Sequence, residues 1–153
     1  MTRRLIGALA IITTLLLSGC GNDYGVDQYG QKVAAERLDK QWLVVNYWAE
    51  WCGPCRTEIP ELNALAAQLK GQGGGVFGGN FDNVQGAELK AASDKLGIKF
   101  TVLAQNPDGI FEIPRSEALP VTYIIDDKGK VREQLMGEQT AEGVLAKLKA
   151  LKG

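Results

Sequence analysis

The chain has 153 residues, of which 45% are hydrophobic and 23% are charged, a composition that fits one folded domain and excludes a disordered chain. Its 17 basic and 18 acidic residues give a formal net charge of −1, so no large basic excess favours binding to nucleic acid. The absence of histidine excludes a Ser-His or Cys-His catalytic pair, a histidine-ligated metal and a haem held by histidine.

The first 19 residues are predicted to be a secretory signal peptide. Arg3 and Arg4 form a short positive start, and residues 5–17 are then almost wholly apolar. This run is too short to span about 30 Å of hydrocarbon, which needs about 20 residues. A basic start, a short apolar run and small residues at its end are typical of a signal that is removed from the mature protein.

The chain has an odd number of cysteines, three, so Cys20 needs an explanation of its own. The sequence Leu-Ser-Gly-Cys at residues 17–20 resembles the lipobox of bacterial lipoproteins, in which the cysteine becomes the first mature residue and carries lipid. An ordinary secretory signal with an incidental cysteine is the alternative. The resemblance implies a multiply acylated Cys20 with a stable hold on the lipid bilayer, because several acyl chains bind more firmly than one. It places the protein at the periplasmic face of a bacterial membrane, and Gly21, rather than Asp, favours the outer membrane over the inner.

One domain is expected after the signal peptide at residues 1–19. Residues 21–31 hold three glycines and few aliphatic side chains. We therefore expect the lipidated Cys20 and a flexible tether over residues 20–32, and a folded domain over residues 33–153.

Hydrophobic patterning along the domain predicts alternating strands and helices. The run at residues 42–48 is apolar, β-branched and aromatic, as in a strand buried on both faces. Helices are predicted from Pro54 to a stop at Gly71, over residues 84–96, and after a cap at Thr140. Further strands are predicted at residues 75–81, 100–103, 121–125 and 130–135, with turns at residues 106–109 and 127–129. This order implies an α/β fold with a mixed central sheet and helices on both faces.

The chemistry is concentrated at residues 52–55, Cys-Gly-Pro-Cys, between a buried strand and the start of a helix. Two cysteines separated by two residues can close a small disulfide there. The first sulfur faces unpaired backbone N–H groups and the positive end of the helix dipole, which favours the thiolate form of Cys52 as a nucleophile. Cys55 lies one turn into the helix, so we expect it to attack the mixed disulfide and release the product.

Other uses of this motif fit less well. A zinc site needs about four ligands, and the cysteine pair supplies two. Covalent haem attachment needs a histidine after the second cysteine, where this chain has Arg56. A purely structural disulfide rarely spans so tight a loop beside a helix start. We therefore expect redox-active thiols, with no metal and no cofactor.

The residues around the cysteine pair resemble the thioredoxin superfamily. Residues 49–55, Ala-Glu-Trp-Cys-Gly-Pro-Cys, are similar to thioredoxin itself. Two features are more similar to the extracytoplasmic ResA- and TlpA-like proteins. Asn46 stands where cytoplasmic thioredoxins have a buried Asp, and Glu58 follows the second cysteine by three residues. The resemblance implies a thioredoxin fold with an extra helix and strand inserted before a cis-proline.

The same resemblance assigns roles to residues near the pair. It implies that Glu58 tunes the cysteines, because a nearby carboxylate favours the neutral thiol; a solvated helix glutamate is the alternative. It implies that Trp51 covers the disulfide and contributes to a substrate-binding surface with Gly53 and Pro54. A tryptophan buried in the core is the alternative for Trp51.

Residues 119–122, Leu-Pro-Val-Thr, match the superfamily's cis-proline segment, which faces the disulfide. The resemblance implies a cis peptide bond before Pro120, since an X–Pro bond is the only common route to a cis peptide. It also implies that the backbone of Leu119 is open to an incoming substrate chain, which would bind by strand-like pairing. A trans proline that opens a strand is the alternative.

Three functions fit these features. The favoured one is a membrane-anchored periplasmic reductase of protein disulfides, because Gly-Pro between the cysteines resembles thioredoxin, whose potential is roughly −270 mV. In an oxidising compartment a reductase needs a membrane electron donor, and the resemblance suggests a DsbD-like partner. The second function is a disulfide oxidase or isomerase, although such relatives usually carry His between the cysteines. The third is a non-catalytic binding module, against which the intact cysteine pair argues. A monomer is expected.

Overall fold

The structure is a computed structural model that describes residues 22–114 and 116–153. The predicted signal peptide at residues 1–19 and the predicted lipidation site at Cys20 lie outside the described residues. Within the described ranges, every helix falls short of the length and apolarity that a membrane span requires.

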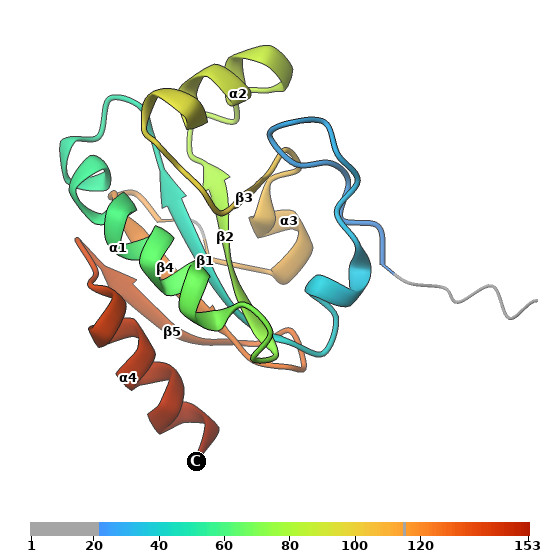
Figure 1. Cartoon of the computed structure of the whole chain (residues 1–153), viewed down its shortest axis with the longest axis vertical. Coiled ribbons are helices and arrows are strands. Elements are labelled where there is room, and N and C mark those ends of the chain that lie inside the picture. Colours follow the sequence, from blue (N-terminus) through green and yellow to red (C-terminus); the bar gives the residue numbers. More distant parts are fainter. Residues whose placement is uncertain (1–21, 115) are drawn as a thin grey trace, which may run out of the picture.

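Five strands form one sheet in the order β3-β2-β1-β4-β5 (Figure 1). Strands β1, β2 and β3 are parallel, whereas β4 runs antiparallel to β1 and β5 antiparallel to β4. The predicted mixed sheet is therefore confirmed, with the predicted strand at residues 42–48 at its centre. The strands are β1 (Trp42–Trp48), β2 (Gly74–Asn80), β3 (Thr101–Leu103), β4 (Val121–Ile125) and β5 (Val131–Met136).

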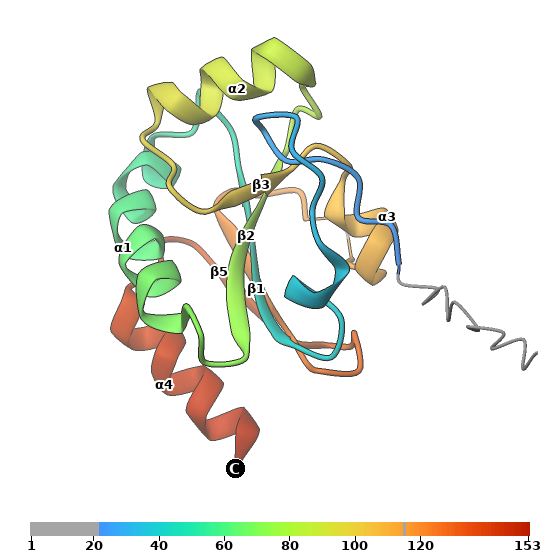
Figure 2. The same ribbon diagram turned by 45° about the vertical axis from the view of Figure 1, so that its right-hand side comes forward.

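Helices cover both faces of the sheet, because alternate residues of β1 point to opposite sides. Val44 and Trp48 pack in one core with the long helices, whereas Val45 and Tyr47 pack in a second core with the short helix and the N-terminal segment. Figure 2 shows α1 and α4 on one side of the sheet and α3 on the other. The helices are α1 (Gly53–Leu69), α2 (Gly86–Lys95), α3 (Pro107–Phe111) and α4 (Ala141–Lys152), with a 3-10 turn η1 (Ala35–Arg37).

Two glycines of β2 let aromatic side chains of β1 approach the backbone. A Cβ atom at Gly78 would lie 3.1 Å from Trp48 Nε1. A Cβ atom at Gly79 would lie 2.9 Å from Pro107 Cδ and 3.0 Å from Tyr47 Cε1. Both positions therefore need glycine, one for each face of the sheet.

The turn predicted at residues 106–109 is wrong, because Pro107 starts the short helix α3. Asn106 caps this helix by accepting a hydrogen bond from the backbone N–H of Asp108 at 3.4 Å. An Asn cap followed by Pro favours a helix start as well as a turn. The burial of Phe111 in the core on this face stabilises the helix.

The flexible tether predicted over residues 20–32 is wrong for the part that the structure describes. Tyr24 and Gln28 are each only 5% exposed. The Gln28 side chain donates to the Phe100 carbonyl at 3.0 Å and accepts from the Val102 N–H at 2.8 Å, which satisfies backbone groups beside β3. The N-terminal segment is therefore packed on the domain, which begins earlier in the sequence than predicted.

Candidate active site

Cys52 and Cys55 form a disulfide at the carboxyl end of β1, where the chain turns into α1. Their Cα atoms are 5.3 Å apart. Cys52 is the N-cap of α1, and the backbone N–H of Cys55 donates to Cys52 Sγ at 3.2 Å. Cys52 is 4% exposed and Cys55 is fully buried. Of the two sulfur-bearing residues, Cys52 is the one that an incoming molecule can reach.

The start of α1 can stabilise a negative charge on Cys52 once the disulfide is opened. The first N–H groups of a helix have no partner within it and carry the positive end of its dipole. These groups favour a thiolate at the N-cap. Gly53 and Pro54, the next two residues, are both exposed, so they are open to a partner.

Glu58 lies one turn beyond Cys55 on the buried side of α1 and is 1% exposed. Its Oε1 accepts a hydrogen bond from Asn46 Nδ2 at 2.7 Å, and its Oε2 accepts from the backbone N–H of Gln139 at 3.1 Å. Within the described ranges, no basic side chain forms a salt bridge with it. Burial outweighs the two hydrogen bonds and raises the pKa of Glu58 to about 7. Glu58 can therefore exchange a proton near neutral pH.

Asn46 connects Glu58 to β4. It is fully buried, and its Nδ2 also donates to Thr122 Oγ1 at 3.0 Å. Its Oδ1 accepts no hydrogen bond from any described residue. An amide can donate to a carboxylate or accept from a carboxylic acid, but it takes up no proton itself. Asn46 therefore suits either protonation state of Glu58.

Trp51 lies on the surface next to Cys52 and is 63% exposed, so it is not a core residue. Its Nε1 donates to Asp82 at 2.8 Å. Its ring meets the ring of Phe81 edge-on, with centroids 6.3 Å apart and planes at 85°. An exposed aromatic ring held beside a disulfide offers a rigid apolar surface to a partner.

The peptide bond between Leu119 and Pro120 is cis. Pro120 is buried and Leu119 is half-buried. The Pro120 carbonyl accepts from the Gly137 N–H at 2.9 Å, and Thr122 two residues later bonds to Asn46. The proline segment and Glu58 are thus joined through one amide side chain.

Sequence reasoning missed two partners in this site. Gln139 acts on Glu58 through its backbone N–H, so its side chain carries no signal. Asp82 orients Trp51 but is one of many surface acids in the sequence. Across residues 22–114 and 116–153, no group of three or more ligand side chains is placed to hold a metal ion.

Comparisons with known proteins agree with this geometry. The chain matches the AhpC/TSA family over residues 16–134, a range that contains Cys52, Cys55 and Pro120. It is 32% identical over 125 residues to the thiol-disulfide oxidoreductase ResA of Bacillus thuringiensis (strain Al Hakam), covering 82% of this chain and 72% of that protein. It is 37% identical over 100 residues to a thiol:disulfide interchange protein DsbE homolog of Paracoccus denitrificans (strain Pd 1222), covering 65% and 52%. A crystal structure of a thioredoxin-family thiol:disulfide interchange protein from Chlorobium tepidum TLS is similar with a TM-score of 0.69 and 25% identity, covering 84% and 92%.

Proposed function

Because the chain belongs to the AhpC/TSA family and is a ResA-like thiol-disulfide oxidoreductase of the thioredoxin superfamily, we propose that it reduces disulfides in other proteins. The observation that carries the proposal is the Cys52–Cys55 pair at the start of α1, with the buried Glu58 one turn further along the same helix. The start of the helix stabilises the thiolate of Cys52, and the buried acid accepts the proton of Cys55.

The exchange takes two steps. The Cys52 thiolate attacks one sulfur of the substrate disulfide, which breaks that S–S bond, forms a mixed disulfide with Cys52 and releases the other substrate sulfur as a thiolate. Cys55 then loses its proton and attacks Cys52 Sγ, which breaks the mixed disulfide and releases the second substrate thiolate. Two electrons pass from the dithiol to the substrate, and the Cys55 proton passes to a base. The protein is left with its Cys52–Cys55 disulfide, which a dithiol donor must reduce again.

Glu58 is the proposed acceptor of the Cys55 proton. The two residues share the buried side of α1, and a carboxylate whose pKa is about 7 can take a proton at Oε1 or Oε2 near neutral pH. Asn46 then presents its carbonyl instead of its N–H to the protonated acid. A negative charge at Glu58 also disfavours the Cys55 thiolate, which makes the dithiol a better reductant.

The direction of electron flow is tested by the redox potential. Gly53 and Pro54 separate the cysteines, and the chain has no histidine to stabilise a thiolate between them. We expect a potential of roughly −270 mV, as in thioredoxin, measured by equilibrating the protein with dithiothreitol or glutathione buffers. A potential of roughly −120 mV, as in strong oxidants, would indicate a disulfide oxidase instead of a reductase.

Protein substrates are tested by trapping. In Cys55→Ala the attack by Cys52 stops at the mixed disulfide, so substrates stay bound and mass spectrometry identifies them. The matched control is Cys52→Ala, which cannot form the mixed disulfide. If Cys55→Ala expressed in its host traps no more protein than this control, protein disulfides are not the substrates.

The place of action is part of the proposal. We propose that Cys20 is acylated, that the protein acts as a monomer at the periplasmic face of a bacterial membrane, with the outer membrane favoured, and that a DsbD-like membrane dithiol donor reduces it. The lipobox-like sequence at residues 17–20 supports the acylation of Cys20 and the membrane location. Mass spectrometry of the N-terminal peptide from fractionated membranes should show acyl chains on Cys20, and a Cys20→Ser variant should move to the soluble fraction. An unmodified Cys20 in the wild-type protein would contradict the anchor but leave the redox chemistry intact.

A further inference from the structure

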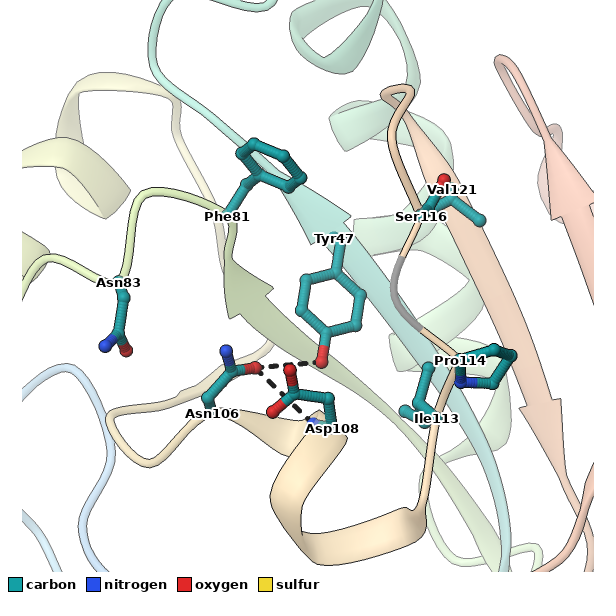
Figure 3. A pocket seen from close by; sticks show the side chains of 9 residues that line it. All are labelled: Tyr47, Phe81, Asn83, Asn106, Asp108, Ile113, Pro114, Ser116 and Val121. Atoms are coloured by element: carbon teal, nitrogen blue, oxygen red, sulfur yellow. Dashed lines mark hydrogen bonds between the residues drawn. The ribbon is translucent and has the colours of Figure 1, made fainter.

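A small cavity opens on the face of the sheet opposite α1, next to the disulfide loop. Its volume is about 180 Å³, smaller than the roughly 300–1,000 Å³ of most small-molecule sites, so it has room for one long side chain. Figure 3 shows its lining, which comes from the end of β1, the loop after β2, the start of α3, and the segment that leads into and includes the first residue of β4. The lining residues are Tyr47, Phe81, Asn83, Asn106, Asp108, Ile113, Pro114, Ser116 and Val121.

The cavity adjoins the redox site through two of its walls. Phe81 packs edge-on against Trp51, which directly precedes Cys52. On the opposite wall, Val121 directly follows Pro120, and its carbonyl accepts from Asn46 Nδ2 at 3.5 Å. The cavity therefore adjoins the surface that a polypeptide would contact when its disulfide reaches Cys52.

The walls and one end of the cavity differ in chemistry. Phe81, Ile113 and Val121 give it apolar sides. Tyr47 Oη donates to Asn106 Oδ1 at 2.9 Å, and that oxygen also accepts from the Asp108 N–H at 3.4 Å, so these groups already have partners. Burial raises the pKa of Tyr47 far above its ordinary value, which keeps its hydroxyl a neutral donor.

Asp108 carries the one formal charge among the nine lining residues. Within the described ranges, its carboxylate accepts no hydrogen bond and forms no salt bridge. Lysine and arginine combine an apolar stem with a cationic end, so such a side chain can lie along the apolar walls and place its charge at Asp108.

We propose that this cavity is a specificity site that takes a lysine or arginine side chain located near the reactive cysteine of the substrate. The inference rests on the proposed reduction of protein disulfides and adds a substrate class to it. Asp108 selects the substrate through charge and takes no part in the exchange of sulfur.

The test is a set of peptides, each closed by one intramolecular disulfide and differing only at one position within three residues of a cysteine. That position carries Arg, Lys, Gln or Glu in turn, and the reduced full-length protein is assayed for kcat/KM on each peptide. At one position, Arg and Lys should exceed Glu by roughly tenfold, with Gln in between. The ratio should shrink as salt is raised, because the attraction is ionic.

Two variants of one residue make the test specific. Asp108→Asn should bring the Arg-to-Glu ratio to within roughly twofold, and Asp108→Lys should reverse it in favour of Glu. The control is Asp127→Asn in the exposed turn between β4 and β5, which removes an equal charge outside the cavity and should keep the wild-type ratio. Arg115, which lies outside the described residues, is kept in every variant.

The outcomes distinguish a failure of the specificity site from a failure of the proposed reductase activity. If the wild-type protein reduces all four peptides at equal rates at every position, or if Asp108→Asn keeps the full preference, the cavity has no such role and the reductase proposal stands. If the wild-type protein reduces none of the peptides while a dithiol control reduces them all, the reductase proposal fails and the inference fails with it.

Discussion

Two neighbouring residues of β1, Asn46 and Tyr47, organise two very different sides of the redox site. Asn46 points towards α1 and binds Glu58, which is 1% exposed and accepts one hydrogen bond at each carboxylate oxygen. Tyr47 points towards α3 and lines an open cavity with Asp108, whose carboxylate has no hydrogen-bond partner in the described ranges. Because successive side chains of a strand alternate in direction, one strand end serves both sides. The buried side suits proton exchange, and the open side suits recognition.

The largest effect is expected from removing the nucleophilic sulfur, on whose chemistry both sides of the site depend. Cys52→Ser lacks the sulfur nucleophile, so the reduction of insulin disulfides by dithiothreitol should lose its catalysed part, a fall of more than about a thousandfold. Ala64→Ser, an exposed change on the same helix, should keep the wild-type rate. Turnover retained in Cys52→Ser would mean that neither side serves a thiol exchange at this cysteine.

The next largest effect is the pH dependence of stability that Glu58 causes on the buried side. The pKa of Glu58 rises from an ordinary 4.5 to about 7 on folding, so the native state binds its proton more tightly than the unfolded state does. This contribution to stability is complete below pH 4.5 and is lost as the pH rises through 7, a change on the order of 3 kcal/mol. The free energy of unfolding of the oxidised wild-type protein, measured with urea, should therefore fall as the pH rises over this range.

Glu58→Gln isolates that contribution, because the amide does not titrate. It keeps an acceptor for Asn46 but loses the hydrogen bond from the Gln139 N–H, so it should be less stable than wild type by about 1 kcal/mol at pH 5. At pH 8 it should be the more stable protein, by about 1.5 kcal/mol. Thr122→Val disturbs the same network without a titratable group and should lower stability equally at both pH values. If the free energies of unfolding of Glu58→Gln and wild type change with pH in the same way across this range, Glu58 does not hold its proton.

The sequence predicted the centre of the molecule better than its edges. The strand at residues 42–48 was predicted with its observed bounds, because a run buried on both faces is apolar throughout. Asn46 and Glu58 were both singled out, but their contact and the burial of Glu58 depend on β4 and on the backbone at Gln139. Such packing between distant segments leaves no periodic pattern in the sequence.

The cavity side was predicted least well, and for a physical reason. Asn106 and Pro107 favour a turn or a helix start equally, and only the burial of Phe111 against Tyr24 decides between them. The N-terminal segment looked like a tether because of its glycines, yet Tyr24 and Gln28 anchor it through contacts with residues far along the chain. Both errors lie on the face that Tyr47 belongs to.

A smaller effect is expected from a steric change that affects the cavity side and leaves the Glu58 side intact. Gly79→Ala places a methyl group 2.9 Å from Pro107 Cδ and 3.0 Å from Tyr47 Cε1, so either β2 or α3 must shift. We expect a loss of about 1–3 kcal/mol in the free energy of unfolding and a weaker preference for basic peptides, with the pH response of Glu58 unchanged. Gly109→Ala in α3 meets no atom within 4 Å and should gain up to about 1 kcal/mol. Equal stability of the two variants would mean that the approach of β2 to the cavity is looser than the structure shows.

The smallest effect concerns the segment that covers the Tyr47 face. Tyr24→Phe removes the hydroxyl that donates to Asp39 Oδ1 at 2.6 Å but keeps the ring stacked on Phe111. Loss of this hydrogen bond should lower the free energy of local opening of the N-terminal segment by about 1 kcal/mol. The amides of Gln28 and Ala104 form hydrogen bonds between this segment and the rest of the domain, so they should exchange with solvent roughly fivefold faster. Amides between β1 and β4 should keep their wild-type rates, because they belong to the sheet that both faces share. Faster exchange there as well would mean that the N-terminal segment supports the whole domain, and that the two sides of the site are less independent than their separate cores indicate.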